Sequence, residues 1–81
     1  MDSNQKIPRI GQRYKHYKGG EYQIVSVSRF EPKPSKILVT YFPLYFADEN
    51  GQIRDWTRTL ENFLEKVEVD GKKVPRFKML K

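Results

Sequence analysis

Short strand-like stretches, divided by turn signals, make up the first part of the chain. Residues 12–18 have no helical apolar stripe and end at Gly19–Gly20, a pair that readily supplies the positive φ values of a tight hairpin turn. In the next run, 21–30, the apolar positions change parity between Ile24 and Val25. A change of parity within one strand predicts a bulge or a strong bend.

The middle of the chain predicts a loop and then a buried strand. Pro32 and Pro34 interrupt the strand pattern, so 31–35 is expected to be a loop. The run 36–46 is apolar at both parities, which is typical of a central strand with both faces covered. Pro43 is expected near the end of that strand or on a sheet edge, because proline has no N–H to donate to a neighbouring strand.

A second loop and strand are predicted after residue 46. The loop 47–52 contains Asn50–Gly51, a strong turn signal. The stretch 53–57 then alternates as a strand, which places Arg54, Trp56 and Arg58 on one face.

A short helical turn and a hairpin end the pattern. Thr59 is a candidate N-cap, and the apolar residues of 60–64 recur at spacings of three and four, which predicts one or two helical turns. The segment 65–77 predicts a hairpin with its turn at Asp70–Gly71.

These elements predict a mainly β fold. Short, closely spaced strands with one helical turn favour a small SH3-like β-barrel of about five to six strands. Residues 11–78 are expected to form this single barrel domain, with a flexible N-terminal arm over 1–10 and a C-terminal tail over 79–81.

Composition narrows the functional classes. The 81 residues include no cysteine and one histidine, so a disulfide, a thiolate nucleophile and a transition-metal site are not expected. The chain has no glycine-rich phosphate loop and no nucleophile elbow, which argues against an enzyme and against a bound cofactor. It also has no secretory signal pattern and no apolar run of about 20 residues, so we expect a cytoplasmic protein without a membrane span, and a monomer.

The net charge of +6 is concentrated at the two ends. Residues 1–20 carry five basic residues and one acid, and residues 71–81 carry five basic residues and no acid. A basic balance of this kind favours polyanionic partners, although it is also common in small domains that bind none.

The chain resembles domain-of-unknown-function family 1653. The resemblance is carried by 14-YKHYKGGEY-22, 44-LY-45, 56-WTR-58, 63-FLEKV-67 and 70-DGKKVPRF-77. It implies an SH3-type barrel and no known reaction. Residues at positions matching the family pattern are His16, Tyr17, Lys18, Gly19, Tyr22, Trp56, Arg58, Gly71, Pro75, Arg76 and Phe77. The chain departs from the family at 30-FEPKPSK-36, where relatives carry a His-Ser-Glu-Thr-like loop, and at Thr59, where they carry proline.

His16 supports three interpretations. It is a hydrogen-bonded structural residue at the barrel rim, a member of a shallow site with Trp56 and Arg58, or a catalytic group. The first is the commonest role of a lone histidine, with Tyr14 or Tyr17 in the core. In the second, a histidine beside an arginine orients an anionic or planar ligand by charge-assisted hydrogen bonds.

Trp56 supports two interpretations. A single tryptophan in a small domain usually fills the core, and we expect Trp56 to be partly buried with its edge lining any groove. The alternative is that Trp56 and the arginines of its face stack on a base or bind a phosphate. Near the C-terminus, Phe77 is expected to close one end of the barrel and Arg76 to pair with an acid such as Glu65.

Two functions remain for a binding module of this kind. The first is binding of RNA or single-stranded DNA, or of another polyanion, with phosphate contacts from Lys15, Lys18, Lys72, Lys73 and Arg76 and base stacking on Tyr17 or Trp56. The second is binding of a protein, a peptide or a small ligand in a groove lined by Tyr14, His16, Tyr17, Trp56 and Arg58.

Overall fold

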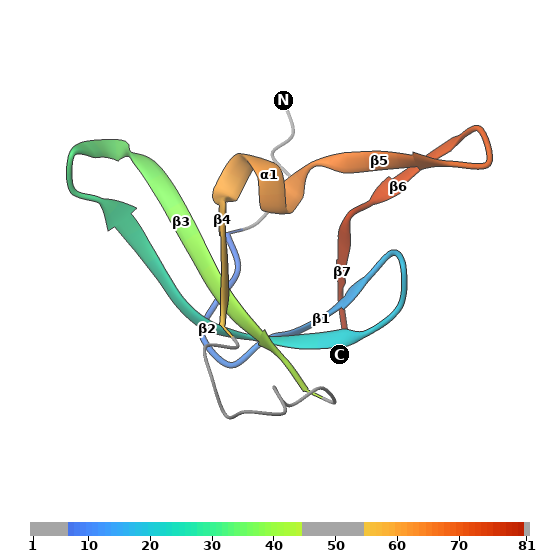
Figure 1. The fold of residues 1–81 in the computed structure, drawn as a ribbon, viewed down its shortest axis with the longest axis horizontal. Coiled ribbons are helices and arrows are strands. Elements are labelled where there is room, and N and C mark those ends of the chain that lie inside the picture. The colour runs from blue at the N-terminus through green and yellow to red at the C-terminus, as the bar shows by residue number, and fades with distance from the viewer. Residues whose placement is uncertain (1–6, 45–54, 81) are drawn as a thin grey trace.

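The fold is mainly β, as predicted. It is taken from a computed structural model, which describes residues 7–44 and 55–80. The strands are β1 Arg13–His16, β2 Glu21–Phe30, β3 Lys33–Pro43, β4 Trp56–Thr59, β5 Lys66–Val69, β6 Lys72–Pro75 and β7 Phe77–Met79, and the one helix among these elements, α1, spans Leu60–Leu64 (Figure 1). The predictions for 47–52 and for the beginning of the 53–57 strand lie outside the described residues.

The strands form two antiparallel sheets and not a closed barrel. The larger sheet has the order β4-β3-β2-β1-β7, and β5 pairs with β6 in a separate hairpin. The predicted barrel closure is therefore wrong, since β4 and β7 remain two separate edges in the described part of the chain. In place of strand pairing between these edges, α1 follows β4 and packs on one face of the sheet, where Phe63 contacts Tyr41 of β3 and Phe77 of β7.

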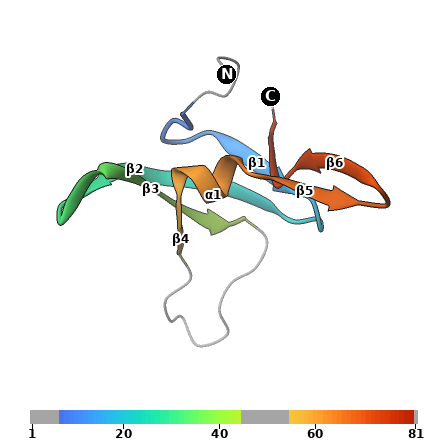
Figure 2. The same cartoon turned by 90° about the horizontal axis from the view of Figure 1, so that it is seen from above.

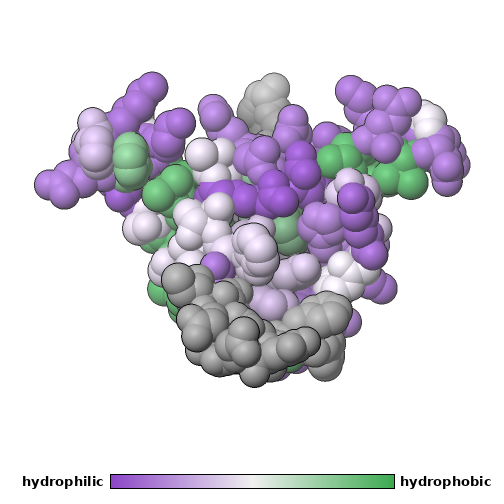
Figure 3. All heavy atoms as spheres, viewed as in Figure 1, coloured by the Kyte–Doolittle hydropathy of each residue, from purple (hydrophilic) through white to green (hydrophobic). Residues whose placement is uncertain are grey.

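Two hairpins extend from the centre of the molecule. Figure 1 shows α1 between the tip of β2–β3 and the tip of β5–β6, and Figure 2 shows the same two tips pointing away from the helix in opposite directions. In Figure 3, hydrophilic side chains gather over both tips, and a hydrophobic patch lies over β5–β6, where Val69 is 37% exposed.

The β1–β2 hairpin and the bulge in β2 form where the sequence predicts them. Gly19 and Gly20 adopt φ values of 101° and 83°, which turn β1 into β2. The pairing of β2 with β3 then jumps from Ile24–Tyr41 to Ser26–Thr40 and leaves Val25 unpaired. This bulge explains the change of parity, because it places Ile24 and Val27 on the same side of the sheet.

The predicted loop 31–35 is mostly strand. Phe30 pairs with Lys33, so only Glu31 and Pro32 form the turn, and β3 continues through Pro34. A proline is tolerated there because the pairing with β2 jumps from Arg29–Ile37 to Phe30–Lys33, so Pro34 has no partner residue on β2, and β4 pairs with β3 only from Leu38 onward. Pro43 is the last residue of β3, as predicted.

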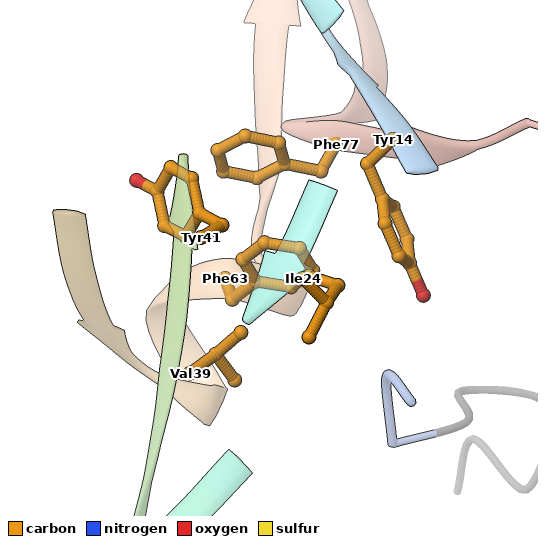
Figure 4. Packing of buried hydrophobic residues seen from close by; sticks show 6 residues of the cluster. All are labelled: Tyr14, Ile24, Val39, Tyr41, Phe63 and Phe77. Carbon is orange, nitrogen blue, oxygen red and sulfur yellow. The ribbon is translucent and has the colours of Figure 1, made fainter. Parts of the chain in front are cut away.

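The core lies between α1 and one face of the larger sheet, which we call the inner face. Its buried side chains are Tyr14, Ile24, Val39, Tyr41, Phe63 and Phe77 (Figure 4). Phe63 stacks on Phe77 with ring centroids 4.3 Å apart and planes 8° apart. The helix that carries Phe63 begins at the predicted cap, where the Thr59 hydroxyl accepts a hydrogen bond from the backbone N–H of Asn62 at 3.1 Å.

The last hairpin also forms at its predicted turn. Asp70 and Gly71 have φ values of 53° and 81°, and two consecutive positive values are typical of a type I′ turn. Val67 pairs with Val74 across the hairpin.

The helix α1 has five residues. Within residues 7–44 and 55–80, no helix is long and apolar enough to cross a membrane.

Candidate functional site

Four of the predicted groove residues lie on the inner face of the larger sheet. Tyr14 and His16 alternate along β1 and therefore point to the same side. On β4, Trp56 is opposite Tyr41 and Arg58 is opposite a buried valine of β3, so both side chains share the face of Tyr41. The sheet thus brings the lone histidine and the lone tryptophan to one face, although they lie on strands that are not neighbours.

Two tyrosines connect His16 to Arg58 across this face. The ring of Tyr22 lies 6.3 Å from the ring of His16 and 5.4 Å from that of Tyr41. The Tyr41 hydroxyl accepts a hydrogen bond of 2.8 Å from Arg58 Nε. A continuous line of contacts therefore runs from β1 to β4.

Arg58 is held in one orientation by three neighbours. Besides the bond from Nε to Tyr41, its Nη1 donates to Asn62 Oδ1 on α1. Its Cζ lies 5.8 Å from the centroid of the Phe77 ring, which is the distance of a cation–π contact. Two hydrogen bonds use two of the five guanidinium N–H groups, so the remaining donors are positioned by the same contacts.

His16 lies in an aromatic and electropositive environment. Its ring centroid is 5.0 Å from that of Phe77 and 4.7 Å from that of Tyr17. The backbone N–H of Lys18 donates to His16 Nδ1 at 3.1 Å, so the neutral imidazole carries its proton on Nε2. Burial lowers the pKa of His16, and the charges of Arg58, Arg76 and Lys18 lower that pKa further.

Arg76 forms the predicted ion pair with Glu65. Its Nη2 lies 2.8 Å from Glu65 Oε1, and its Nε donates to the backbone carbonyl of Asn62 at 3.2 Å. The Arg76 side chain is 17% exposed and that of Glu65 is 55% exposed. The guanidinium thus attaches the segment between β6 and β7 to the end of α1.

Trp56 is far more exposed than predicted. The whole residue is 60% exposed, so it does not fill the core. The reason is its position: Trp56 is the first residue of an edge strand, whereas α1 begins only after Thr59 and covers a different part of the face. Tyr17 in the β1–β2 turn is also exposed, and Lys18 Nζ lies 5.7 Å above its ring.

We call the set His16, Tyr17, Tyr22, Tyr41, Trp56 and Arg58 the arginine–aromatic surface. Tyr14, a further predicted member, lies outside it. Tyr14 and Tyr41 both belong to the core, but the Tyr41 hydroxyl bonds to Arg58, whereas the Tyr14 hydroxyl lies 3.4 Å from Gln12 Oε1. Figure 4 shows this hydroxyl pointing away from Tyr41.

The five predicted phosphate contacts do not share one face. Lys15 alternates with His16 along β1 and is therefore on the outer face of the sheet. Lys72 and Lys73 are consecutive in β6 and so point to opposite sides of the hairpin, where Lys73 is opposite Glu68. Lys18 in the β1–β2 turn contacts the arginine–aromatic surface, because its Nζ lies 5.7 Å from the centroid of the Tyr17 ring.

The arrangement offers hydrogen-bond donors and positive charge, not metal ligands. Among the described residues, no three histidine, cysteine, aspartate or glutamate side chains come together as a group that could hold a metal ion. The polar groups at the surface are guanidinium, imidazole and phenol, which suit an oxygen-rich anion.

Residues 12–79 match the family described as protein of unknown function (DUF1653). The chain belongs to this family. A crystal structure of a DUF1653 protein from Bordetella bronchiseptica has the same fold, with a TM-score of 0.72 and 29% sequence identity over 90% of this chain and 87% of that one. No curated protein matches the chain. The family resemblance seen in the sequence is thereby confirmed.

Three residues of the site were not found from the sequence. Tyr41 was expected only as part of the covered strand 36–46, and the structure confirms its burial but adds its hydrogen bond to Arg58. Asn62 was seen only as part of a helix, yet its side chain accepts from Arg58. Tyr22 was noted only as a position that matches the family pattern, and the sequence did not predict its contact with His16.

Proposed function

We propose that this DUF1653 protein is a binding module, and that its ligand carries an oxyanion and a flat ring and docks on the arginine–aromatic surface. The observation that carries the proposal is the charge around His16. Arg58, Arg76 and Lys18 all act on its imidazole, and the hydrogen bonds to Tyr41 and Asn62 fix the position of Arg58. An anionic group placed here gains favourable interactions with these cations, which exposed, well-separated lysines do not provide.

Each part of such a ligand has a counterpart on the surface. The oxyanion accepts hydrogen bonds from the His16 Nε2–H and from the Arg58 N–H groups that Tyr41 and Asn62 do not use. The ring stacks on Trp56 or Tyr17, whose side chains are exposed before any ligand arrives. Arg58 needs little reorganisation on binding, because Tyr41, Asn62 and Phe77 already hold it in place.

A titration followed by ¹⁵N NMR tests this proposal. Phenyl phosphate is the probe, and benzyl alcohol is the control that has the ring without the charge. We expect phenyl phosphate to shift the Trp56 indole N–H and the amides of His16 and Tyr17, and benzyl alcohol to shift them far less. Equal shifts with both compounds, or shifts at other residues, contradict the proposal.

The Trp56→Ala variant separates stacking from folding. Trp56 is 60% exposed, so its removal leaves the core intact. Loss of one stacking ring weakens binding by about tenfold or more, since such contacts contribute about 1–3 kcal/mol. Phe30→Ala, which removes an exposed aromatic ring from the β2–β3 tip, is the matched control and leaves the affinity unchanged.

Single-stranded nucleic acid is a second candidate for this surface. It is supported by the net charge of +6 and by the position of Lys18 over the exposed ring of Tyr17, since a polynucleotide supplies both a phosphate and a base. Binding of an oligothymidylate that falls steeply with added salt favours this candidate, with the shifts extending to Lys72 and Lys73. Salt-tolerant binding of phenyl phosphate without binding of the oligonucleotide favours a small ligand.

A further inference from the structure

In the described part of the chain, the edge strand β7 has backbone groups that point away from its one neighbouring strand. In the described part of the chain β7 pairs only with β1, through Lys15–Lys78 and the two neighbouring pairs. The carbonyl of Arg76 and the N–H of Leu80 also bond to the β1 side. Because peptide groups alternate in direction along a strand, the N–H and C=O groups of Phe77 and Met79 point away from β1. No backbone hydrogen bond within the described residues engages these groups.

An apolar cavity lies beside this edge. It has a volume of about 860 Å³, and its apolar wall is formed by Ile7, Pro8, Tyr14, Leu64 and Met79. Met79 is 44% exposed and Ile7 is 51% exposed, so the wall is open to solvent. Tyr14 and Met79 are direct partners across β1 and β7, which places the cavity on the inner face of the sheet.

The charged residues of β7, of β1 and of the segment 7–12 are all basic, and Glu65 beside the start of β7 is paired with Arg76. The segment 7–12, β1 and β7 contain Arg9, Arg13, Lys15 and Lys78 and no acidic residue. Arg9 lines the cavity, while Lys78 and Lys15 are paired on the outer face. Along β7, Met79 therefore places an apolar side chain on the inner face, and Lys78 places a positive side chain on the outer face.

We propose that the β7 edge binds an extended acidic peptide of a partner protein as an added strand. The peptide alternates apolar and acidic side chains: the apolar ones enter the cavity beside Met79, and the acidic ones face Lys78 on the outer face. Its backbone bonds to the outward-facing N–H and C=O of Met79, which is 44% exposed whereas Phe77 is 6% exposed, and this is the general mode of strand addition to an open sheet edge. A second copy of this chain is the poorer occupant, because antiparallel pairing of two β7 edges about Lys78 brings the two lysines together.

This site is separate from the arginine–aromatic surface and does not depend on the proposed function. The added strand uses the edge of β7, whereas the proposed anion site uses side chains of β1, β3 and β4. Phe77 is near both sites, but through different atoms. Its ring contacts His16 and Arg58, whereas its backbone N–H and C=O point away from β1.

The test uses a synthetic heptapeptide in which four glutamates alternate with three valines, blocked at both ends. The control peptide has the same composition with the four glutamates first and the three valines last. We expect the alternating peptide to shift the amides of Lys78, Met79 and Leu80 and to bind at least tenfold more tightly than the block peptide. Equal binding of the two peptides would mean charge attraction without strand addition and overturns the proposal.

Two variants separate the backbone and charge contributions. Met79→Pro removes an outward-facing N–H while leaving the pairing of Lys78 with β1, since proline is tolerated where its missing N–H would face solvent. It is expected to weaken binding of the alternating peptide by at least tenfold. Lys78→Glu is expected to weaken the glutamate peptide similarly and to favour a peptide with lysine in place of glutamate, a reversal that loss of folding cannot produce.

Sedimentation velocity of the free protein addresses the competing occupant. A monomer across the concentration range leaves the edge open to a partner peptide. A dimer that is lost in Met79→Pro and that excludes the alternating peptide assigns the edge to a second copy and overturns the proposal.

Discussion

The centre of the molecule around α1 and the β5–β6 hairpin are stabilised in different ways, although the sequence marks both as β-structure. Around α1, six side chains are at most 6% exposed and pack on the inner face of the sheet. In the β5–β6 hairpin no residue is buried, and its valines are half-buried or exposed. The hairpin has a favourable turn and the Val67–Val74 pair, but its contact with the rest of the fold depends on Arg76. Strand propensity and turn residues are thus sufficient to form both regions. Only the region that is packed against a helix has a buried core.

The largest expected effect on stability is in the core around α1. Phe63→Ala removes a ring that is 1% exposed and stacked on Phe77, so we expect the free energy of unfolding to fall by about 3–5 kcal/mol. Urea denaturation followed by circular dichroism measures it. Phe30→Ala, at a residue that is 41% exposed, is the control and is expected to cost less than about 1 kcal/mol. A similar loss in both variants would show that α1 does not define the core.

An intermediate effect is expected where the hairpin meets α1. Arg76→Gln removes the ion pair with Glu65 and the charged hydrogen bond to the carbonyl of Asn62. We expect a loss of about 1–2 kcal/mol, mostly from that hydrogen bond, because the ion pair is largely exposed. Amide exchange in β5–β6 should accelerate more than in β2–β3. Val69→Ala, in the same hairpin, should change stability by no more than about 0.5 kcal/mol; if it costs as much as Arg76→Gln, the hairpin is held by its own side chains.

The smallest effect concerns the protonation of His16. Its pKa in the folded protein lies below the unfolded value of about 6.5, so the unfolded chain takes up the proton first as the pH falls. The contribution of His16 to stability is therefore complete above that unfolded value and is lost as the pH falls through the folded pKa. An NMR titration of the imidazole ring measures the folded pKa directly.

Charge substitutions sharpen the same measurement. Arg58→Gln should raise the pKa of His16, because Arg58 is the strongest of the three charges that lower it. Lys18→Ala should raise it less, since Lys18 is the weakest of the three and its backbone N–H still bonds to Nδ1. A larger rise in Lys18→Ala than in Arg58→Gln would contradict the proximity of Arg58 to the imidazole.

Local signals in the sequence predicted most of the elements. The turns at Gly19–Gly20 and Asp70–Gly71 require positive φ values, and those residues supply them. The Thr59 cap and the bulge after Ile24 were also readable, because each depends on neighbours within a few residues. The error at 31–35 arose because Pro34 disrupts a strand only where a neighbouring strand would pair with its missing N–H, and the sequence does not show that the register of β2 and β3 shifts at this point.

The arrangement of the elements in space was harder to predict. Barrel closure depends on whether the edge strands pair with each other, and the exposure of Trp56 depends on where α1 begins to cover the sheet. At the candidate site, the shared face of Trp56 and Arg58 followed from strand alternation. The hydrogen bond of Arg58 to Tyr41 joins residues 17 positions apart, and no local pattern marks it.

The bulge at Val25 has a consequence for single-residue deletions in β2. If Val25 were paired in plain alternation, Ser26 and Ser28 would face the core and Val27 would face water, so the bulge is what keeps Val27 opposite Val39. Deletion of Val25 removes the extra residue and joins the Ile24–Tyr41 pair directly to the Ser26–Thr40 pair. The bulge can thus absorb the loss of one residue without turning any side chain of the distal half of the hairpin, which a strand without an extra residue cannot do.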